Sequence, residues 1–157
     1  MTLTKFEGGS LRTPYQDVDL SFIPEMTTQS YVPGGGTNLF DAVGERIETL
    51  AERLQSWNVQ PDVLLVVMTD GGDTCSKYFN AQMISNLVAR YRDLGWGFAY
   101  LGSDANALRI GQTMGFNSGE IRCFENANIE ETFRDLATAT TVYRAAKAAG
   151  ATATMFR

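Results

Sequence analysis

Residues 62–74 read DVLLVVMTDGGDT, a wholly apolar run that gives way at once to acidic and glycine residues. A strand buried on both faces of a parallel sheet has a continuous run of this kind, so Val66 should be buried in a central strand. Ligands of such sheets bind beyond the carboxyl ends of the strands. The pattern therefore predicts a buried strand that carries Asp70 to a binding site.

A second loop lies upstream, where residues 33–42 read PGGGTNLFDA and run into a helical pattern. Its glycines can bring the backbone, and with it the hydroxyl of Thr37, close to an ion. Taken alone, Thr37 or Asn38 could be only a helix N-cap, with Asp41 as the acidic partner of a capping box. Asp70 alone could be a turn residue. The pair favours one site with oxygen ligands.

Strand and helix patterns alternate along the chain, which predicts an α/β fold with a mostly parallel sheet, an antiparallel edge strand and helices on both faces. We expect strands over 2–6, 11–15, 19–23, 63–68, 98–101 and 121–124. Helices should begin near residues 38, 79, 105 and 128. Residues 1–150 should form a single domain, and residues 151–157, which lack a core pattern, should fray.

In their order and separation the two loops resemble those of the von Willebrand factor A domain family, and the similarity extends over nearly the whole chain. It is strongest to a subgroup of small intracellular bacterial and phage domains. The resemblance implies a Rossmann-like, three-layer fold and a metal-ion-dependent adhesion site. It makes Thr37 and Asp70 the metal ligands. The rim of that site would include Gly36, Asn38, Gly71, Asp73, Ser103 and Asp104.

Members of this family open with an apolar strand that ends in Asp-x-Ser-x-Ser and lies at the centre of the sheet. The present sequence starts at Met1, where the following strand of the family should begin. The resemblance therefore implies that the first central strand is missing, which leaves a seam between the strands over 2–6 and 63–68. Because unpaired strand edges attract further strands, we expect the chain to self-associate there or to accept a strand from a protein partner.

Composition narrows the function further. The chain has 157 residues, a formal net charge of −5 and no histidine. The acidic balance argues against a nucleic-acid partner held through its phosphates, and no apolar stretch is long enough to cross a bilayer. We therefore expect a cytoplasmic protein without a membrane partner, or a virion component if the gene is carried by a phage. The lack of histidine excludes Ser-His-Asp and Cys-His catalysis.

Oxygen ligands favour a hard divalent cation, Mg²⁺ or Mn²⁺. The side chains of Thr37 and Asp70 alone would hold such an ion weakly, so the metal site would be incomplete unless a partner supplies an acidic ligand. The expected function is that of a non-enzymatic protein-binding module that mediates interaction or assembly.

Two alternatives stay open. A metal-dependent phosphatase or hydrolase could use Asp17, Asp19 and Asp70, because residues 17–21, DVDLS, are similar to the start of haloacid-dehalogenase-like phosphatases. Those enzymes have a buried strand before the motif, whereas residues 12–16, RTPYQ, favour a solvated loop. The other alternative is a structural component of an assembly, with a vestigial ion site. A nucleotide-binding role is disfavoured, because the glycine loop lacks the lysine of a phosphate-binding loop.

Overall fold

The computed structural model describes residues 1–25, 34–58, 61–103, 106–125, 128–151 and 155–156. Its larger sheet has three parallel strands in the order β3 (Leu64–Thr69), β4 (Gly97–Gly102) and β5 (Ile121–Cys123). Leu64 lies opposite Gly97, and Tyr100 lies opposite Ile121. The α/β fold and the parallel sheet predicted from the sequence are confirmed.

The central strand of this sheet is β4 rather than β3. Every residue of β4 is buried, whereas only Val67 and Thr69 of β3 are buried and Val66 is 39% exposed. The prediction that Val66 is buried is therefore wrong. The reason is that β3 pairs with β4 on one side and, within the described chain, with no strand on the other.

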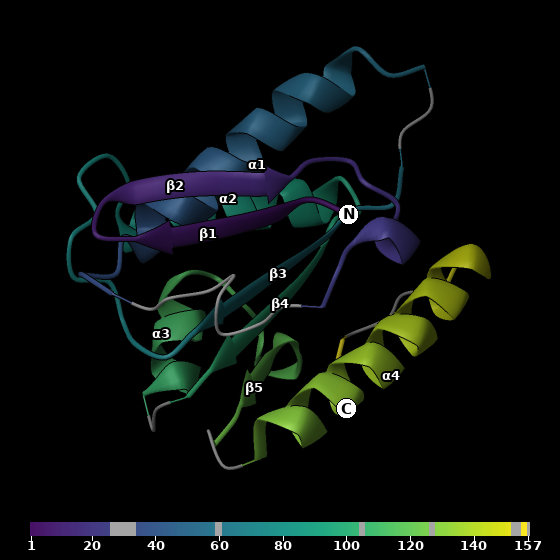
Figure 1. Cartoon of the computed structure of the whole chain (residues 1–157). Helices are drawn as coiled ribbons and strands as arrows, with labels where there is room; N and C mark the ends of the chain where they lie inside the picture. Colours follow the sequence, from purple (N-terminus) through teal and green to yellow (C-terminus); the bar gives the residue numbers. More distant parts are fainter. Residues whose placement is uncertain (26–33, 59–60, 104–105, 126–127, 152–154, 157) are drawn as a thin grey trace.

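A separate antiparallel pair is formed by β1 (Leu3–Glu7) and β2 (Ser10–Tyr15), in which Phe6 lies opposite Leu11. The antiparallel pairing near the N-terminus is as predicted, but the prediction that it forms an edge of the parallel sheet is wrong, because the two strands form a sheet of their own. From top to bottom, Figure 1 shows the strands in the order β2, β1, β3, β4 and β5. No backbone ladder joins β1 to β3 among the described residues. The two sheets therefore lie side by side with unpaired edges between them.

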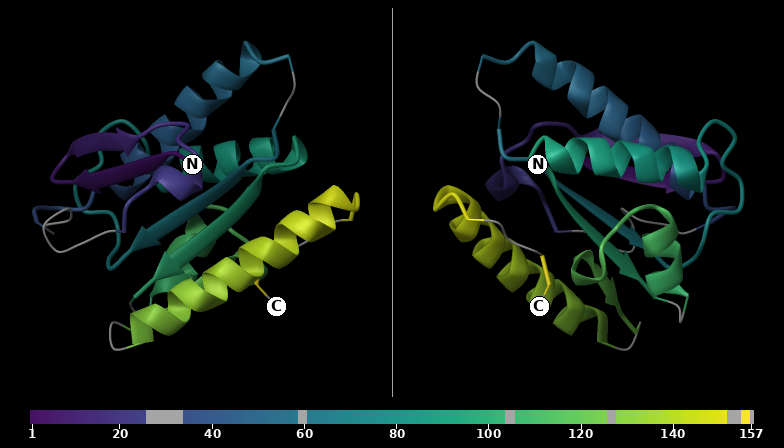
Figure 2. Two further views of the ribbon diagram at one scale, coloured as in Figure 1. Left: turned by 45° about the vertical axis from the view of Figure 1, so that its right-hand side comes forward. Right: turned by 180° about the vertical axis from the view of Figure 1, so that it is seen from behind.

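Helices cover both faces of the larger sheet, as predicted (Figures 1 and 2). One face carries α1 (Leu39–Gln55), α2 (Ala81–Asp93) and α3 (Ala107–Thr113), and the other carries α4 (Ile129–Ala148). The core of the first face includes Leu39, Ile47, Ile84, Val88, Phe98 and Tyr100. The core of the second face includes Ala99, Leu101 and Tyr143. None of the described helices combines the length and hydropathy needed to cross a membrane.

The segment after β2 is helical, not a strand. Residues Leu20–Phe22 form the 3₁₀ helix η1. The carboxylate of Asp19 accepts hydrogen bonds from the backbone N–H of Ser21 at 2.9 Å and from its hydroxyl at 2.7 Å. This local capping outweighs the weak alternation on which the predicted strand over 19–23 depended.

The end of the chain is packed against the fold. Met155 and Phe156 are 4% and 5% exposed, and both join the core beneath α4. The backbone N–H of Phe156 donates a 2.8 Å hydrogen bond to the carbonyl of Gly119, in the 3₁₀ helix η2 (Ser118–Glu120) that precedes β5. The expectation that residues 151–157 fray is therefore wrong for Met155 and Phe156.

Candidate functional site

The two loops singled out in the sequence lie together beyond the carboxyl end of β3. The backbone N–H of Thr37 donates a 2.7 Å hydrogen bond to the hydroxyl of Thr74. In return, the carbonyl of Thr37 accepts hydrogen bonds from the backbone N–H groups of Thr74 at 2.8 Å and Cys75 at 3.2 Å. These bonds fix the Thr37 loop, residues 34–38, to the segment that follows Asp70.

Residues of that segment, rather than the Thr37 loop, cap α1. The backbone N–H of Phe40 donates to the carboxylate of Asp73 at 3.2 Å, and that of Asp41 donates to the hydroxyl of Ser76 at 3.0 Å. Asn38 occupies the N-cap position but makes no capping bond through its side chain. The predicted N-cap role of Asn38 is therefore wrong, because side chains more than 30 residues away supply the acceptors.

Asp41 binds the backbone of residues 77–79, which follow the two loops of the site. The residue is 8% exposed, and its carboxylate accepts hydrogen bonds from the backbone N–H groups of Lys77 at 2.8 Å, Tyr78 at 2.9 Å and Phe79 at 2.8 Å. Burial raises the pKa of Asp41, but the amides of Lys77, Phe79 and Tyr78 outweigh it and hold the pKa below its usual range. The predicted capping-box role is wrong.

Glycines allow the Thr37 loop to approach its neighbours closely. Gly35 has a φ of +74°, and a Cβ there would lie 3.1 Å from the Cα of Gly8. A Cβ on Gly36 would lie 3.0 Å from the hydroxyl oxygen of Thr74. The carbonyl of Gly36 also accepts a 2.6 Å hydrogen bond from the backbone N–H of Gly8, in the turn after β1. The site is therefore bordered by the β1–β2 turn as well as by the two loops.

Asp70 lies where β3 and β4 end. Its carbonyl accepts a 2.9 Å hydrogen bond from the hydroxyl of Ser103, whose backbone N–H donates to the carbonyl of Thr69 at 3.3 Å. The side chain of Asp70 is exposed, and its carboxylate makes no hydrogen bond or ion pair within the described residues. The hydroxyl of Thr37 makes none there either, and no hydrogen bond joins Thr37 directly to Asp70.

The other rim residues differ in what they offer. Asn38 is 2% exposed, and its Oδ1 has no hydrogen-bond partner within the described part of the chain. The carboxylate of Asp73 is already engaged as a cap. A Cβ on Gly71 would meet no atom within 4 Å, so this part of the rim is open. Asp104 lies outside the described residues.

The oxygen atoms at the site are of the kind that a hard cation prefers, but there are too few of them to hold one tightly. Thr37 and Asp70 carry the oxygen atoms that Mg²⁺ prefers. Neither here nor elsewhere among the described residues do three acidic or cysteine side chains lie close enough together to hold a metal ion. A hollow of about 440 Å³ is lined by Asp62 and Tyr143 at the amino end of β3, and is therefore not part of this site.

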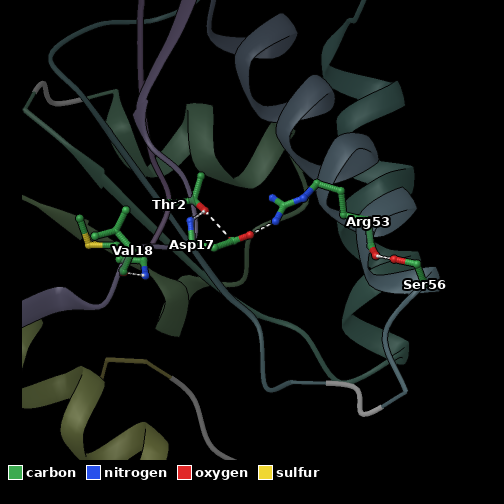
Figure 3. Close-up of polar contacts among 6 residues, drawn as sticks. Thr2, Asp17, Val18, Arg53 and Ser56 are labelled. Atoms are coloured by element: carbon green, nitrogen blue, oxygen red, sulfur yellow. Dashed lines mark hydrogen bonds and ion pairs between the residues drawn. The ribbon is translucent and has the colours of Figure 1, made fainter. Parts of the chain in front are cut away.

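The phosphatase-like motif lies elsewhere. The carboxylate of Asp17 forms an ion pair with Arg53 and accepts a 3.2 Å hydrogen bond from the hydroxyl of Thr2 (Figure 3). Thr2 precedes β1, whereas the turn that touches the Thr37 loop follows it, so the length of β1, roughly 15 Å, separates the two places. Asp19 caps η1. The structure therefore does not gather Asp17 and Asp19 with Asp70.

Comparison of the chain with protein-family models, with curated proteins and with solved structures found no match.

Proposed function

We propose that this chain is a non-enzymatic protein-binding module that contacts its partner at the carboxyl end of β3. The observation that supports this role is the exposed carboxylate of Asp70, which has no partner within the described residues and stands on a rim held by hydrogen bonds to Thr37, Thr74 and Ser103. A charged group on a fixed backbone loses little freedom on binding, which favours an intermolecular contact.

A divalent cation, Mg²⁺ or Mn²⁺, would assist this contact. The hydroxyl of Thr37 and the carboxylate of Asp70 would hold it, and the bound ion would supply the positive charge that lets an acidic partner approach Asp70. The resemblance of the two loops to those of von Willebrand factor A domains agrees with this role. Because these are only two side-chain donors, the ion should bind with millimolar or weaker affinity in the absence of a partner.

Calorimetric titration with Mg²⁺ tests the ion site. We expect weak binding to the wild-type chain and none to Asp70→Ala. Asp93→Ala is the matched control, because Asp93 is also exposed but lies at the end of α2. Micromolar binding to a monomer would contradict the incomplete site, and equal binding to Asp70→Ala would remove Asp70 from it.

The binding role itself is tested by affinity capture followed by titration of the purified candidate. We expect the partner in the cytoplasm, or in the virion if the gene is carried by a phage. Its binding should be lost both in EDTA and in Asp70→Ala, and kept in Asp93→Ala. Mg²⁺-dependent phosphatase activity that disappears in Asp17→Asn would instead favour an enzyme.

A further inference from the structure

The outer side of β3 is an open edge. The carbonyl of Val63 accepts a hydrogen bond from Gly97, and that of Thr69 accepts one from Ser103, so odd-numbered positions direct their peptide groups toward β4. Because peptide groups alternate along a strand, the even-numbered positions direct theirs away from β4. Those positions are Leu64, Val66 and Met68, and none of their outward peptide groups has a hydrogen-bond partner within the described residues.

The outer edges of β2 and β5 are protected, and the open edge of β3 is not. Natural sheets protect their edges with charge, proline or short strands. The outer strand β2 contains Arg12 and Pro14, and β5 has only three residues, one of which is Arg122. By contrast, β3 has six residues, LLVVMT, without a charge or a proline. An unprotected edge of this length is suited to pairing with another strand.

The side chains of the open edge are also incompletely covered. Leu64 and Met68 pack toward the core beneath α4, and Val66 lies between them on the same face. Val66 nevertheless remains 39% exposed. A strand added beside β3 would cover Val66 and pair the peptide groups at the same time.

We propose that β3 accepts an extended strand from a protein partner, inserted between β1 and β3, with apolar side chains on the face toward α4. This proposal deepens the proposed binding role. It rests on that role in one respect, which is that the partner is a protein. The occupant is a single strand rather than a second folded copy, because the β1–β2 pair lies on the open side of β3 (Figure 1). A folded second copy would meet that pair, whereas one strand can lie alongside it.

The test uses a capped peptide with the sequence Lys-Val-Thr-Val-Thr-Val-Glu, which has an apolar face, a polar face and no net charge. Amide hydrogen exchange of the wild-type chain is measured by NMR with and without this peptide. We expect exchange at Leu64, Val66 and Met68 to slow by about tenfold, with no change along β2. The matched control peptide is N-methylated at alternate residues, which removes its strand-pairing donors, and it should have no effect.

Two variants complete the design. Val66→Lys places a charge on the open edge and should abolish the slowing, whereas Val142→Lys, at a position of α4 that is 50% exposed, should not. No slowing at millimolar peptide, or equal slowing by the methylated peptide, would overturn the proposal. If, without peptide, these amides instead exchange more slowly as the protein concentration increases, the edge would be assigned to a second copy. Peptide binding that persists in Asp70→Ala would uphold the strand site even if the ion-assisted contact fails.

Discussion

Asp41, in the first turn of α1, accepts a 2.8 Å hydrogen bond from the backbone N–H of Phe79, 38 residues further along the chain. The same carboxylate accepts from Lys77 and Tyr78. One buried charge therefore holds three consecutive amides, and the order of this segment depends on it.

Asp41→Asn should destabilise the fold by about 2–3 kcal/mol, because an amide replaces a charged acceptor and brings donors toward N–H groups. Glu48→Gln is the control, since Glu48 is exposed on the same helix, and it should change stability by less than about 0.5 kcal/mol. Urea unfolding measures both. Equal effects of the two substitutions would show that the Asp41 hydrogen bonds contribute little.

Stability should fall in acid through the same residue. The pKa of Asp41 is lowered in the folded state, from about 3.9 in the unfolded chain. Its contribution is therefore complete above about pH 5 and is lost as the pH falls below about 4 toward the folded pKa. Unfolding free energies measured from pH 6 to pH 2 should decline more steeply for the wild type than for Asp41→Asn. Parallel profiles would contradict this assignment.

Gly44→Ala should destabilise α1, although alanine is more favourable than glycine in a helix by about 1 kcal/mol. A Cβ at residue 44 would lie 2.5 Å from the ring of Phe79, so the ring must move. Overpacking of this kind costs about 1–3 kcal/mol. The double variant Gly44→Ala with Phe79→Leu should recover part of the loss in a double-mutant cycle. Stabilisation by Gly44→Ala alone would mean that the ring moves freely.

Phe156→Ala should cost about 3–4 kcal/mol, because the side chain is 5% exposed in the core beneath α4. It would also remove the ring on which the guanidinium of Arg122 lies, 5.1 Å from the ring centroid. Phe133→Ala removes an equal ring that is 49% exposed and should have little effect. Thermal unfolding compares the two variants, and similar midpoints would place Phe156 outside the folded core.

Local patterns in the sequence predicted most elements because those elements depend on local properties. Apolar spacing located α1, and the alternation of strands and helices indicated the parallel sheet. The apolar run of β3 could not show how many neighbours the strand has, so Val66 was placed at the centre of the sheet. A run of this composition is required wherever both faces are covered, whether the strand has one partner or two.

The candidate site was predicted less completely than the fold. Sequence patterns predicted that Thr37 and Asp70 lie at the same end of the sheet, because Thr37 precedes a helix and Asp70 follows a strand. They did not reveal that Asp73, Ser76 and Asp41 connect the two loops, since these bonds join distant residues whose pairing no local pattern encodes. The buried end of the chain was missed for a similar reason: Met155 and Phe156 are too few to form a periodic pattern.

The long-range caps of α1 also impose an order on biosynthesis. The acceptors for the N–H groups of Phe40 and Asp41 lie 33 and 35 residues downstream. When α1 first leaves the ribosome, the residues that cap it are still inside the exit tunnel, so its first turn is held only by its own backbone. The N-terminal cap can form only once Asp73 and Ser76 have also emerged.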